Sequence, residues 1–246
     1  MRTLKKERKS TGGNSTGELN KLKSDFVTLA SHEFRTPLTT IQSSAYLLEN
    51  YISGEHKEKI SKHISRILNS VNTLTSMLDE FLSITRIEEG KVKLNAEHMD
   101  IKQFMEMICV KLSDFLKPGQ RILYQHSGES HIYFDALILE IIVRTLVGNA
   151  TKYSPEHTDV CITTSVHNHI YLSVKDAGIG IPAEDQVYLF ERFFRASNAA
   201  NIQGTGLGLH IMKLYLNMLQ GSVLVKSARG QGSEFQITFD QLSPRV

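Results

Sequence analysis

In the segment Ile60–Phe81, ISKHISRILNSVNTLTSMLDEF, large apolar residues recur in alternating steps of four and three. Seven positions follow this spacing without a miss: Ile60, Ile64, Ile67, Val71, Leu74, Leu78 and Phe81. Such spacing places one apolar seam along a helix and is typical of a helix packed along its length against other helices. The segment therefore predicts a long helix with helical partners.

A second helical pattern precedes this segment. Residues 18–52 carry apolar side chains at helical spacing, and the pattern stops at Ser53-Gly-Glu-His56. Two helices joined by a short loop form an antiparallel hairpin. One hairpin of this size encloses little core, whereas two hairpins together form a four-helix bundle. The sequence therefore predicts a homodimer built through a dimeric, all-α four-helix bundle.

The chain changes character after Gly90, where strands and helices mix. Helices are expected over Ile101–Leu116, from Asp135 as N-cap to about Ala150, and over about Leu209–Leu219. Short strands are expected over Arg121–His126, His131–Phe134, Val160–Val166, Ile170–Val174, Ser222–Lys226 and Glu234–Phe239. The order lacks a strict βαβ rhythm and indicates an α+β domain, a two-layer α/β sandwich. We expect a flexible basic linker over 1–17, a hairpin domain over 18–90 and an α+β domain over 95–243.

Composition narrows the classes of function. The 246 residues are 41% hydrophobic and carry a formal net charge of +2. This balance gives no argument for nucleic acid or a membrane surface as a partner, and the basic residues before position 10 are expected to be a solvated connector. No apolar run approaches the ~20 residues that span a membrane, and no secretory signal is visible. We expect a cytoplasmic location for this part of the protein, with any membrane attachment made by parts of a parent protein outside it.

Reactive side chains gather in Ser31–Leu38, SHEFRTPL, on the first helix. His32 lies beside the apolar seam and is expected to be exposed, with Thr36 one turn further along the same face. Pro37 removes a backbone donor and bends the helix next to the histidine. Imidazole is a good nucleophile near neutral pH if another group takes its second proton, and Glu33 is a candidate for that role. A helix histidine is usually only a surface residue, but these neighbours favour a reactive one.

Two segments have side chains that suit a nucleotide. In Asn149–Ser154, NATKYS, the amide oxygen of Asn149 can ligate Mg²⁺ and Lys152 can reach phosphate, although an asparagine near a helix end is often only a cap. In Asp176–Gly180, DAGIG, a carboxylate can accept from the exocyclic amine of adenine, and the glycines permit close approach of a base. A tight strand-to-loop turn explains the second pattern about equally well.

A third segment, Gly204–Gly208, GTGLG, runs into a helix, where bare amides can bind phosphate. It lacks the Gly-Lys-Ser/Thr ending of the Walker pattern. Before it, Phe190–Arg195, FERFFR, predicts a mobile flap with an apolar anchor, and a short amphipathic helix packed on the core is an alternative that is compatible with it. Arg192 or Arg195 could approach phosphates there. The pair His167-x-His169 is interpreted as a hairpin turn, because no third metal ligand is placed near it.

Taken in order, these segments resemble the histidine kinases of two-component signalling. The resemblance covers nearly everything after residue 18. The segments resemble, in turn, the H box (Ser31–Leu38), the N box (Asn149–Ser154), the G1 box (Asp176–Gly180), the F box (Phe190–Arg195), the G2 box (Gly204–Leu209) and the last glycine motif (Ser227–Phe235).

This resemblance implies a dimerisation and phosphotransfer hairpin followed by a Bergerat-type ATP-binding domain. It implies ATP and Mg²⁺ as cofactors and autophosphorylation of His32, with Glu33 as base and Thr36 orienting water in dephosphorylation. The partner is then the receiver domain of a response regulator, which accepts the phosphoryl group on an aspartate. The residues implied at the nucleotide are Asn149, also as metal ligand, Lys152, Tyr153, Asp176, Gly178, Gly180, Arg192, Gly204, Thr205, Gly206, Leu207 and Gly208.

One position departs from the pattern of the family. The N box usually reads Asn-Leu-Leu-x-Asn-Ala, whereas this chain has Thr145-Leu-Val-Gly-Asn-Ala150, so Thr145 replaces an asparagine of the presumed Mg²⁺ shell. Two other functions stay open at this point. One is a hydrolytic ATPase on the same nucleotide-binding fold, which needs a water-activating carboxylate and leaves the H box unexplained. The other is a dimeric scaffold that binds ATP without using it.

Overall fold

The structure is a computed structural model of the chain, and it describes residues 34–49, 56–202 and 204–240. The chain divides into two compact units, Met1–Leu78 and Asp79–Val246. The long helix α2 (Lys57–Glu88) crosses the boundary, so its last ten residues belong to the second unit. The two units are described separately below.

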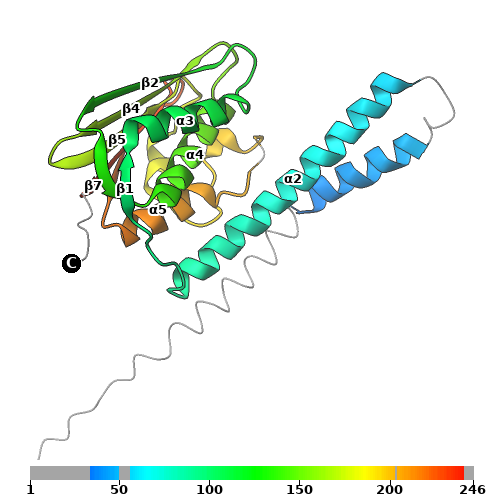
Figure 1. The fold of residues 1–246 in the computed structure, drawn as a ribbon. Helices are drawn as coiled ribbons and strands as arrows, with labels where there is room; N and C mark the ends of the chain where they lie inside the picture. Colours follow the sequence, from blue (N-terminus) through cyan, green and yellow to red (C-terminus); the bar gives the residue numbers. More distant parts are fainter. Residues whose placement is uncertain (1–33, 50–55, 203, 241–246) are drawn as a thin grey trace, which may run out of the picture. The chain divides into compact units, whose positions relative to one another are not determined.

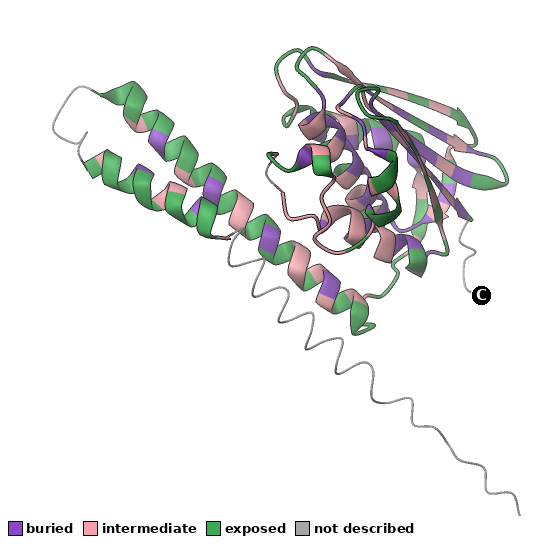
Figure 2. Ribbon diagram, turned by 180° about the vertical axis from the view of Figure 1, so that it is seen from behind, coloured by how far each residue is buried: buried purple, intermediate pink, exposed green. Residues whose placement is uncertain are grey.

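The first unit contains a helical hairpin. A helix over residues 34–49 and the first part of α2 run side by side (Figure 1). This confirms the predicted hairpin. Within the single chain it buries small or polar side chains such as Ser44 and Ser70, while most other positions are exposed (Figure 2). The described residues of the hairpin therefore enclose little apolar core beyond Met77.

Helix α2 ends at the glycine that the sequence indicated. Gly90 has φ +65°, a left-handed conformation that favours glycine. Its N–H donates to the carbonyl of Ile87 at 3.0 Å, and the N–H of Lys91 donates to Arg86 at 2.9 Å. These bonds satisfy carbonyls at the helix end that have no partner within the helix.

The second unit is the predicted two-layer α/β sandwich. Its main sheet has the order β2-β4-β5-β7-β6, from β2 (Arg121–Gly128), β4 (Asp159–Val166), β5 (His169–Lys175), β7 (Ser233–Asp240) and β6 (Ser222–Ser227). Strands β2 and β4 are parallel, and the other neighbours are antiparallel. A two-stranded antiparallel ribbon joins β1 (Glu97–Asp100) to β3 (His131–Phe134). The sequence did not indicate β1, because its four residues, EHMD, show no apolar alternation.

Three helices, α3 (Ile101–Ser113), α4 (Ala136–Tyr153) and α5 (Gly208–Met218), lie on one side of the main sheet (Figure 1). Alternate residues of the strands are buried beneath them, as along β7, where Phe235, Ile237 and Phe239 are buried and the residues between them are partly exposed (Figure 2). Strand side chains alternate between the two faces of a sheet. One face therefore builds the core and the other stays polar, with Ser173 donating to Glu234 at 2.8 Å.

Helix α4 begins as predicted but ends later. Asp135 is its N-cap, and its Oδ1 accepts from the N–H of Ile138 at 3.1 Å. The helix continues one turn beyond the expected end near Ala150, to Tyr153. The expected end was too early because the apolar pattern stops near Ala150, whereas the backbone of the polar residues after it still forms helical hydrogen bonds. Helix α3 instead ends before the expected Leu116, in turns after Ser113.

Between β5 and α5 the described chain has only two short 3-10 helices, η1 (Ala183–Tyr188) and η2 (Ser197–Ala199). Residues 190–195 lie between them in turns, so the expected alternative of an amphipathic helix is wrong. Phe193 has φ +61°, which is incompatible with an α-helix. The pair His167-x-His169 lies at the β4–β5 turn, as interpreted. In the described parts of the chain no helix is long and apolar enough to cross a membrane.

Candidate active site

Three segments that are far apart in sequence meet around the last turns of α4. The N–H of Ile179 donates to the carbonyl of Tyr153 at 3.2 Å, which joins the loop after β5 to the end of this helix. A Cβ atom added at Gly204 would lie 2.3 Å from the Nζ of Lys152. The loop before α5 therefore passes directly beside that ammonium group. The structure thus brings together the N-box, G1-box and G2-box segments.

Asp176 is fixed by the backbone on both sides of its loop. Its Oδ1 accepts from the N–H of Gly178 at 2.7 Å and from that of Ser233 at 3.2 Å. Its Oδ2 accepts no hydrogen bond within the part of the chain that the structure describes. Burial raises the pKa of Asp176, and the two backbone donors oppose this shift. One carboxylate oxygen is thus positioned by the protein and the other is available to a donor such as an amine.

Two glycines of the site have no room for a side chain. Gly180 has φ +63°, and an added Cβ would lie 1.9 Å from the carbonyl oxygen of Ala228. Gly206 has φ +70°, and an added Cβ would lie 2.6 Å from the carbonyl carbon of Phe193. Glycine is required at both positions, since other residues rarely adopt such φ values and a Cβ would overlap the backbone. The loops can therefore pack closely around the end of α4.

The end of α4 presents polar side chains toward these loops. Asn149 is half-buried, and its amide has no hydrogen-bond partner among the described residues. The Nζ of Lys152 lies 4.9 Å from the centre of the Tyr153 ring, close enough for a cation–π contact. At the end of α4, the Nζ of Lys117 donates to the carbonyls of Lys152 and Ser154 at 2.8 and 2.7 Å. This cation neutralises the negative end of the helix dipole.

The loop before α5 is organised by one hydroxyl. The Oγ1 of Thr205 accepts from the N–H of Leu207 at 3.2 Å and donates to the Oε2 of Glu80 at 2.6 Å. Leu207 is buried and anchors the loop to the core, and α5 begins at Gly208. The free backbone N–H groups of the first helical turn are suited to an anion.

Two family models match the chain. The His Kinase A (phospho-acceptor) domain matches residues 22–90, and the histidine kinase-, DNA gyrase B-, and HSP90-like ATPase matches residues 134–243. The chain belongs to the sensor histidine kinases. It holds the catalytic core of a protein-histidine kinase, with a phosphoacceptor region followed by an ATP-binding domain. The first match also argues against a purely hydrolytic ATPase, because such an enzyme would have no use for the phosphoacceptor hairpin that the match covers.

Relatives and solved structures agree with this assignment. The sensor protein GacS of Pseudomonas syringae pv. syringae is 32% identical over 232 residues, which are 90% of this chain and 25% of GacS. The kinase chain thus spans a quarter of the length of that relative. The crystal structure of full-length ShkA in complex with AMPPNP has a TM-score of 0.64 at 27% identity, over 88% of this chain and 46% of that one. The histidine kinase ThkA, in complex with the response regulator protein TrrA, shares the fold with a TM-score of 0.71 at 19% identity, over 93% and 64%.

Thr145, at the position that departs from the family pattern, forms its hydrogen bond within its own helix. The Oγ1 of Thr145 donates to the carbonyl of Ile141 at 2.8 Å, one turn back along α4. Its Cγ2 methyl lies 3.4 Å from where a Cβ at Gly208 would be, so it faces the start of α5. Thr145 therefore shares the side of the helix that faces the glycine-rich loop, and its only hydroxyl proton is used by its own helix.

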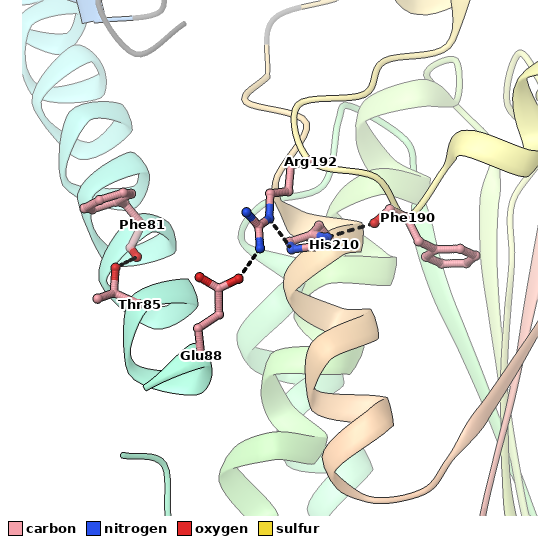
Figure 3. Close-up of polar contacts among 6 residues, drawn as sticks. All are labelled: Phe81, Thr85, Glu88, Phe190, Arg192 and His210. Atoms are coloured by element: carbon pink, nitrogen blue, oxygen red, sulfur yellow. Dashed lines mark hydrogen bonds and ion pairs between the residues drawn. The ribbon is translucent and has the colours of Figure 1, made fainter. Parts of the chain in front are cut away.

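The two arginines of the F box have different surroundings in the kinase. Arg195 donates through one terminal nitrogen to the carbonyls of Ala199, Ala200 and Ile202, so it braces its own loop. Arg192 forms an ion pair with Glu88 and donates from Nε to the Nε2 of His210 at 3.1 Å (Figure 3).

The second ring nitrogen of His210 completes this chain of contacts. Its Nδ1 lies 2.9 Å from the carbonyl oxygen of Phe190 and donates to it, which leaves Nε2 as the acceptor from Arg192 (Figure 3). Burial lowers the pKa of His210, in keeping with a neutral imidazole. Glu88 and His210 thus fix Arg192, and no motif or spacing in the sequence points to either of them.

The phosphoacceptor region is described only in part. His32 and Glu33 lie outside the described residues. Thr36 is exposed on the helix over residues 34–49, and its carbonyl accepts from the Oγ1 of Thr40 at 3.0 Å.

Sequence reasoning also missed residues that support the nucleotide side. The N–H of Ser233 donates to the Oδ1 of Asp176 and its carbonyl accepts from the N–H of Asp176, and the hydroxyl of Ser227 accepts from the N–H of Ile181 at 2.8 Å. Both belong to the last glycine motif, Ser227–Phe235, for which the family resemblance implies no residue role.

Proposed function

We propose that this kinase transfers the γ-phosphoryl group of ATP to His32 and then to an aspartate of a response regulator receiver domain. The observation that carries the proposal is the convergence of Asp176, Asn149 and Lys152 with the glycine-rich loop at the end of α4. In this assignment the hairpin over 18–90 is the phosphotransfer domain and residues 95–243 are the ATP-binding domain, after a basic linker over 1–17. The AMPPNP in the ShkA structure supports ATP as the phosphoryl donor. The response regulator in the ThkA structure supports a receiver domain as the acceptor.

Each residue then has a role that follows from its surroundings. The free Oδ2 of Asp176 accepts from the exocyclic amine of adenine, and Gly178 and Gly180 allow the base to approach the backbone. Lys152 binds phosphate oxygens, and so do the backbone N–H groups of Gly204–Gly208. Tyr153 packs its ring beside Lys152.

Asn149 fits a magnesium ion, because it offers an unpaired, half-buried amide oxygen to a metal that prefers oxygen ligands. When bound, Mg²⁺ neutralises charge on the phosphates. Thr145 is placed on the same side of the helix, but its short, β-branched side chain holds the hydroxyl close to the backbone, where it is bonded back to Ile141. We therefore assign Asn149 and not Thr145 as the ligand from α4.

The transfer step is a displacement at phosphorus. A ring nitrogen of His32 forms a bond to the γ-phosphorus while the bond to the β,γ-bridging oxygen breaks, and ADP leaves. Glu33 takes the proton from the other ring nitrogen, and Thr36 orients the water that later removes phosphate from the response regulator. In the second step the phosphoryl group passes from the histidine nitrogen to an aspartate oxygen of the receiver domain.

The test is incubation with γ-labelled Mg-ATP. We expect a phosphoprotein that is labile in acid and stable in alkali, as a phosphorus–nitrogen bond should be. His32→Gln should lose the label but keep ATP binding, and His98→Gln, an exposed histidine of β1, should behave as wild type. Label that persists in His32→Gln would place the acceptor elsewhere. Free phosphate without phosphoprotein would instead identify a hydrolytic ATPase, and ATP binding without either product a scaffold.

The partner is found by the second half of the same assay. Purified labelled kinase is mixed with a panel of receiver domains, and we expect rapid transfer to one of them. A panel variant with the acceptor aspartate replaced by asparagine is the matched control. Label that stays on the kinase with every receiver domain of the organism would contradict the phosphotransfer role.

A further inference from the structure

The glycine-rich loop is held by a carboxylate from another element. Glu80, near the end of α2, accepts from the hydroxyl of Thr205 at 2.6 Å. The positive charge of Lys152 also acts on this carboxylate. Thr205 and Lys152 are two of the residues that we assign to the nucleotide phosphates. An anion of the protein therefore occupies surroundings that suit a phosphate oxygen.

A carboxylate and a phosphate oxygen compete for the same donors. The hydroxyl of Thr205 has one proton, and Glu80 uses it, while the acceptor side of that hydroxyl is taken by the N–H of Leu207. Two anions beside one ammonium group also repel each other more strongly where water is scarce. Glu80 is partly buried, and this burial raises the pKa of its carboxyl, while the hydrogen bond from Thr205 and the charge of Lys152 oppose the shift. A phosphate can take this position only if the carboxylate leaves it.

The end of α2 is attached by three residues on one face. Glu80, Ile84 and Glu88 are spaced by four, so they lie above one another on the helix. Ile84 is buried in the core of the second unit, with 2% of its surface exposed. Glu88 forms the ion pair with Arg192 (Figure 3). The two outer residues of this face therefore engage Thr205, in the glycine-rich loop of the proposed nucleotide site, and Arg192, in the F-box segment.

We infer that Glu80 is an internal competitor of the nucleotide phosphates, which lowers the affinity of this kinase for ATP for as long as the end of α2 is docked on the glycine-rich loop. The inference rests on the proposed function, since it assigns the contacted residues to phosphate binding. Two ligands that exclude each other are linked reciprocally, so phosphate binding should also loosen the docked helix end.

The test compares the affinities for ATP, ADP and adenosine by titration calorimetry. Glu80→Gln removes the charge but keeps an acceptor for Thr205, and Glu80→Ala removes both. Asp79→Asn, an exposed neighbour, is the control for loss of one negative charge. We expect Glu80→Ala to bind ATP about threefold to tenfold more tightly than wild type, with Glu80→Gln between them. Adenosine affinity should be the same in all four proteins, because adenosine carries no phosphate.

Other outcomes separate the two proposals. Unchanged ATP affinity in both Glu80 variants would overturn the inference and leave the nucleotide site intact. An equal gain for adenosine would also overturn it, since a generally loosened domain would explain that result. A wild-type protein that binds none of the three ligands would contradict the proposed function itself. Thermal unfolding of the same samples shows whether each variant is folded.

Discussion

At the scale of single residues, Asp176 shows how one side chain serves both folding and recognition. Its Oδ1 ties the loop after β5 to Gly178 and Ser233, and its Oδ2 remains available. In Asp176→Asn an amide oxygen can keep the first set of contacts, while the amide nitrogen presents a donor toward the adenine amine. We expect ATP affinity to fall on the order of tenfold to hundredfold, because one charge-assisted hydrogen bond is lost. Calorimetry with unchanged affinity would remove Asp176 from the pocket.

The same substitution should change how the thermal stability of the protein depends on pH. Burial raises the pKa of Asp176 in the folded protein above its unfolded value, so the folded state binds the proton more tightly and the ionised form is the costly one. This contribution to stability is present at low pH and is lost as the pH rises through the folded pKa. Asp176→Asn should therefore melt at the same or a higher temperature than wild type at neutral pH. The difference should shrink as the pH falls through the raised pKa of Asp176.

A variant that melts lower than wild type at every pH would show that the backbone contacts of Oδ1 need the full negative charge. Asp240→Asn, at an exposed carboxylate at the end of β7 that contacts the ring of His169, is a suitable control for the loss of one carboxylate.

Thr145 is the second residue whose role can be measured. The asparagine usual at this position offers an amide on a longer side chain, whereas the Thr145 hydroxyl is bonded back to Ile141. One missing hydrogen bond corresponds to about 0.5–1.5 kcal/mol, so Thr145→Asn should raise the initial rate of His32 phosphorylation roughly threefold to tenfold and lower the Mg²⁺ requirement. Thr145→Val keeps the branched shape and should change both little. Superimposable rate curves for Thr145→Asn and wild type would show that the asparagine is not needed here.

At the scale of secondary-structure elements, α2 belongs to two parts of the molecule. Its last ten residues are counted with the second unit, and Ile84 is their apolar contact with that core. Ile84→Ala should lower the free energy of unfolding of the second unit by about 2–5 kcal/mol, because it leaves a cavity in a packed core. Leu82→Ala, at a more exposed position two residues earlier, should cost much less. Urea unfolding followed by tyrosine fluorescence measures both.

Equal effects of the two substitutions would mean that this helix end is not docked in solution. That result would also weaken the argument about Glu80, which lies one turn before Ile84.

At the scale of the whole molecule, no other described part of the chain covers one apolar surface of the hairpin. Ile64 and Val71 of the apolar seam expose 45% and 44% of their surface, and Leu68, four residues after Ile64 and three before Val71, exposes 57% on the same face. Soluble proteins rarely leave such a row exposed, and a second hairpin would cover it. The hairpin is of the His Kinase A type, which supports a dimer. We propose that these residues line the interface of a homodimeric four-helix bundle.

Leu68→Glu should convert this dimer to a monomer in light scattering coupled to gel filtration, because it buries charge at the proposed seam. Arg66→Glu is the matched control, since two residues along a helix correspond to nearly opposite sides. A Leu68→Glu protein that stays dimeric, or an equal effect of the control, would place the interface elsewhere.

The sequence determined those features that depend on neighbours along the chain. The four-three seam predicts the hairpin, Asp135 the start of α4, and Gly90 the end of α2, and each is confirmed because a helix is built from contacts three to four residues apart. The order of the motifs likewise indicated the kinase family without any knowledge of their positions in space.

Only the tertiary structure decided which side chains meet across long stretches of chain. Glu80 and Thr205 are 125 positions apart, and Glu88 and Arg192 are 104 apart. In the sequence both glutamates look like ordinary surface charges of an amphipathic helix. Strand β1 was missed for a similar reason, since its residues become a strand only by pairing with β3. Such contacts depend on how the helix end packs on the sheet domain, and local spacing carries no information about that packing.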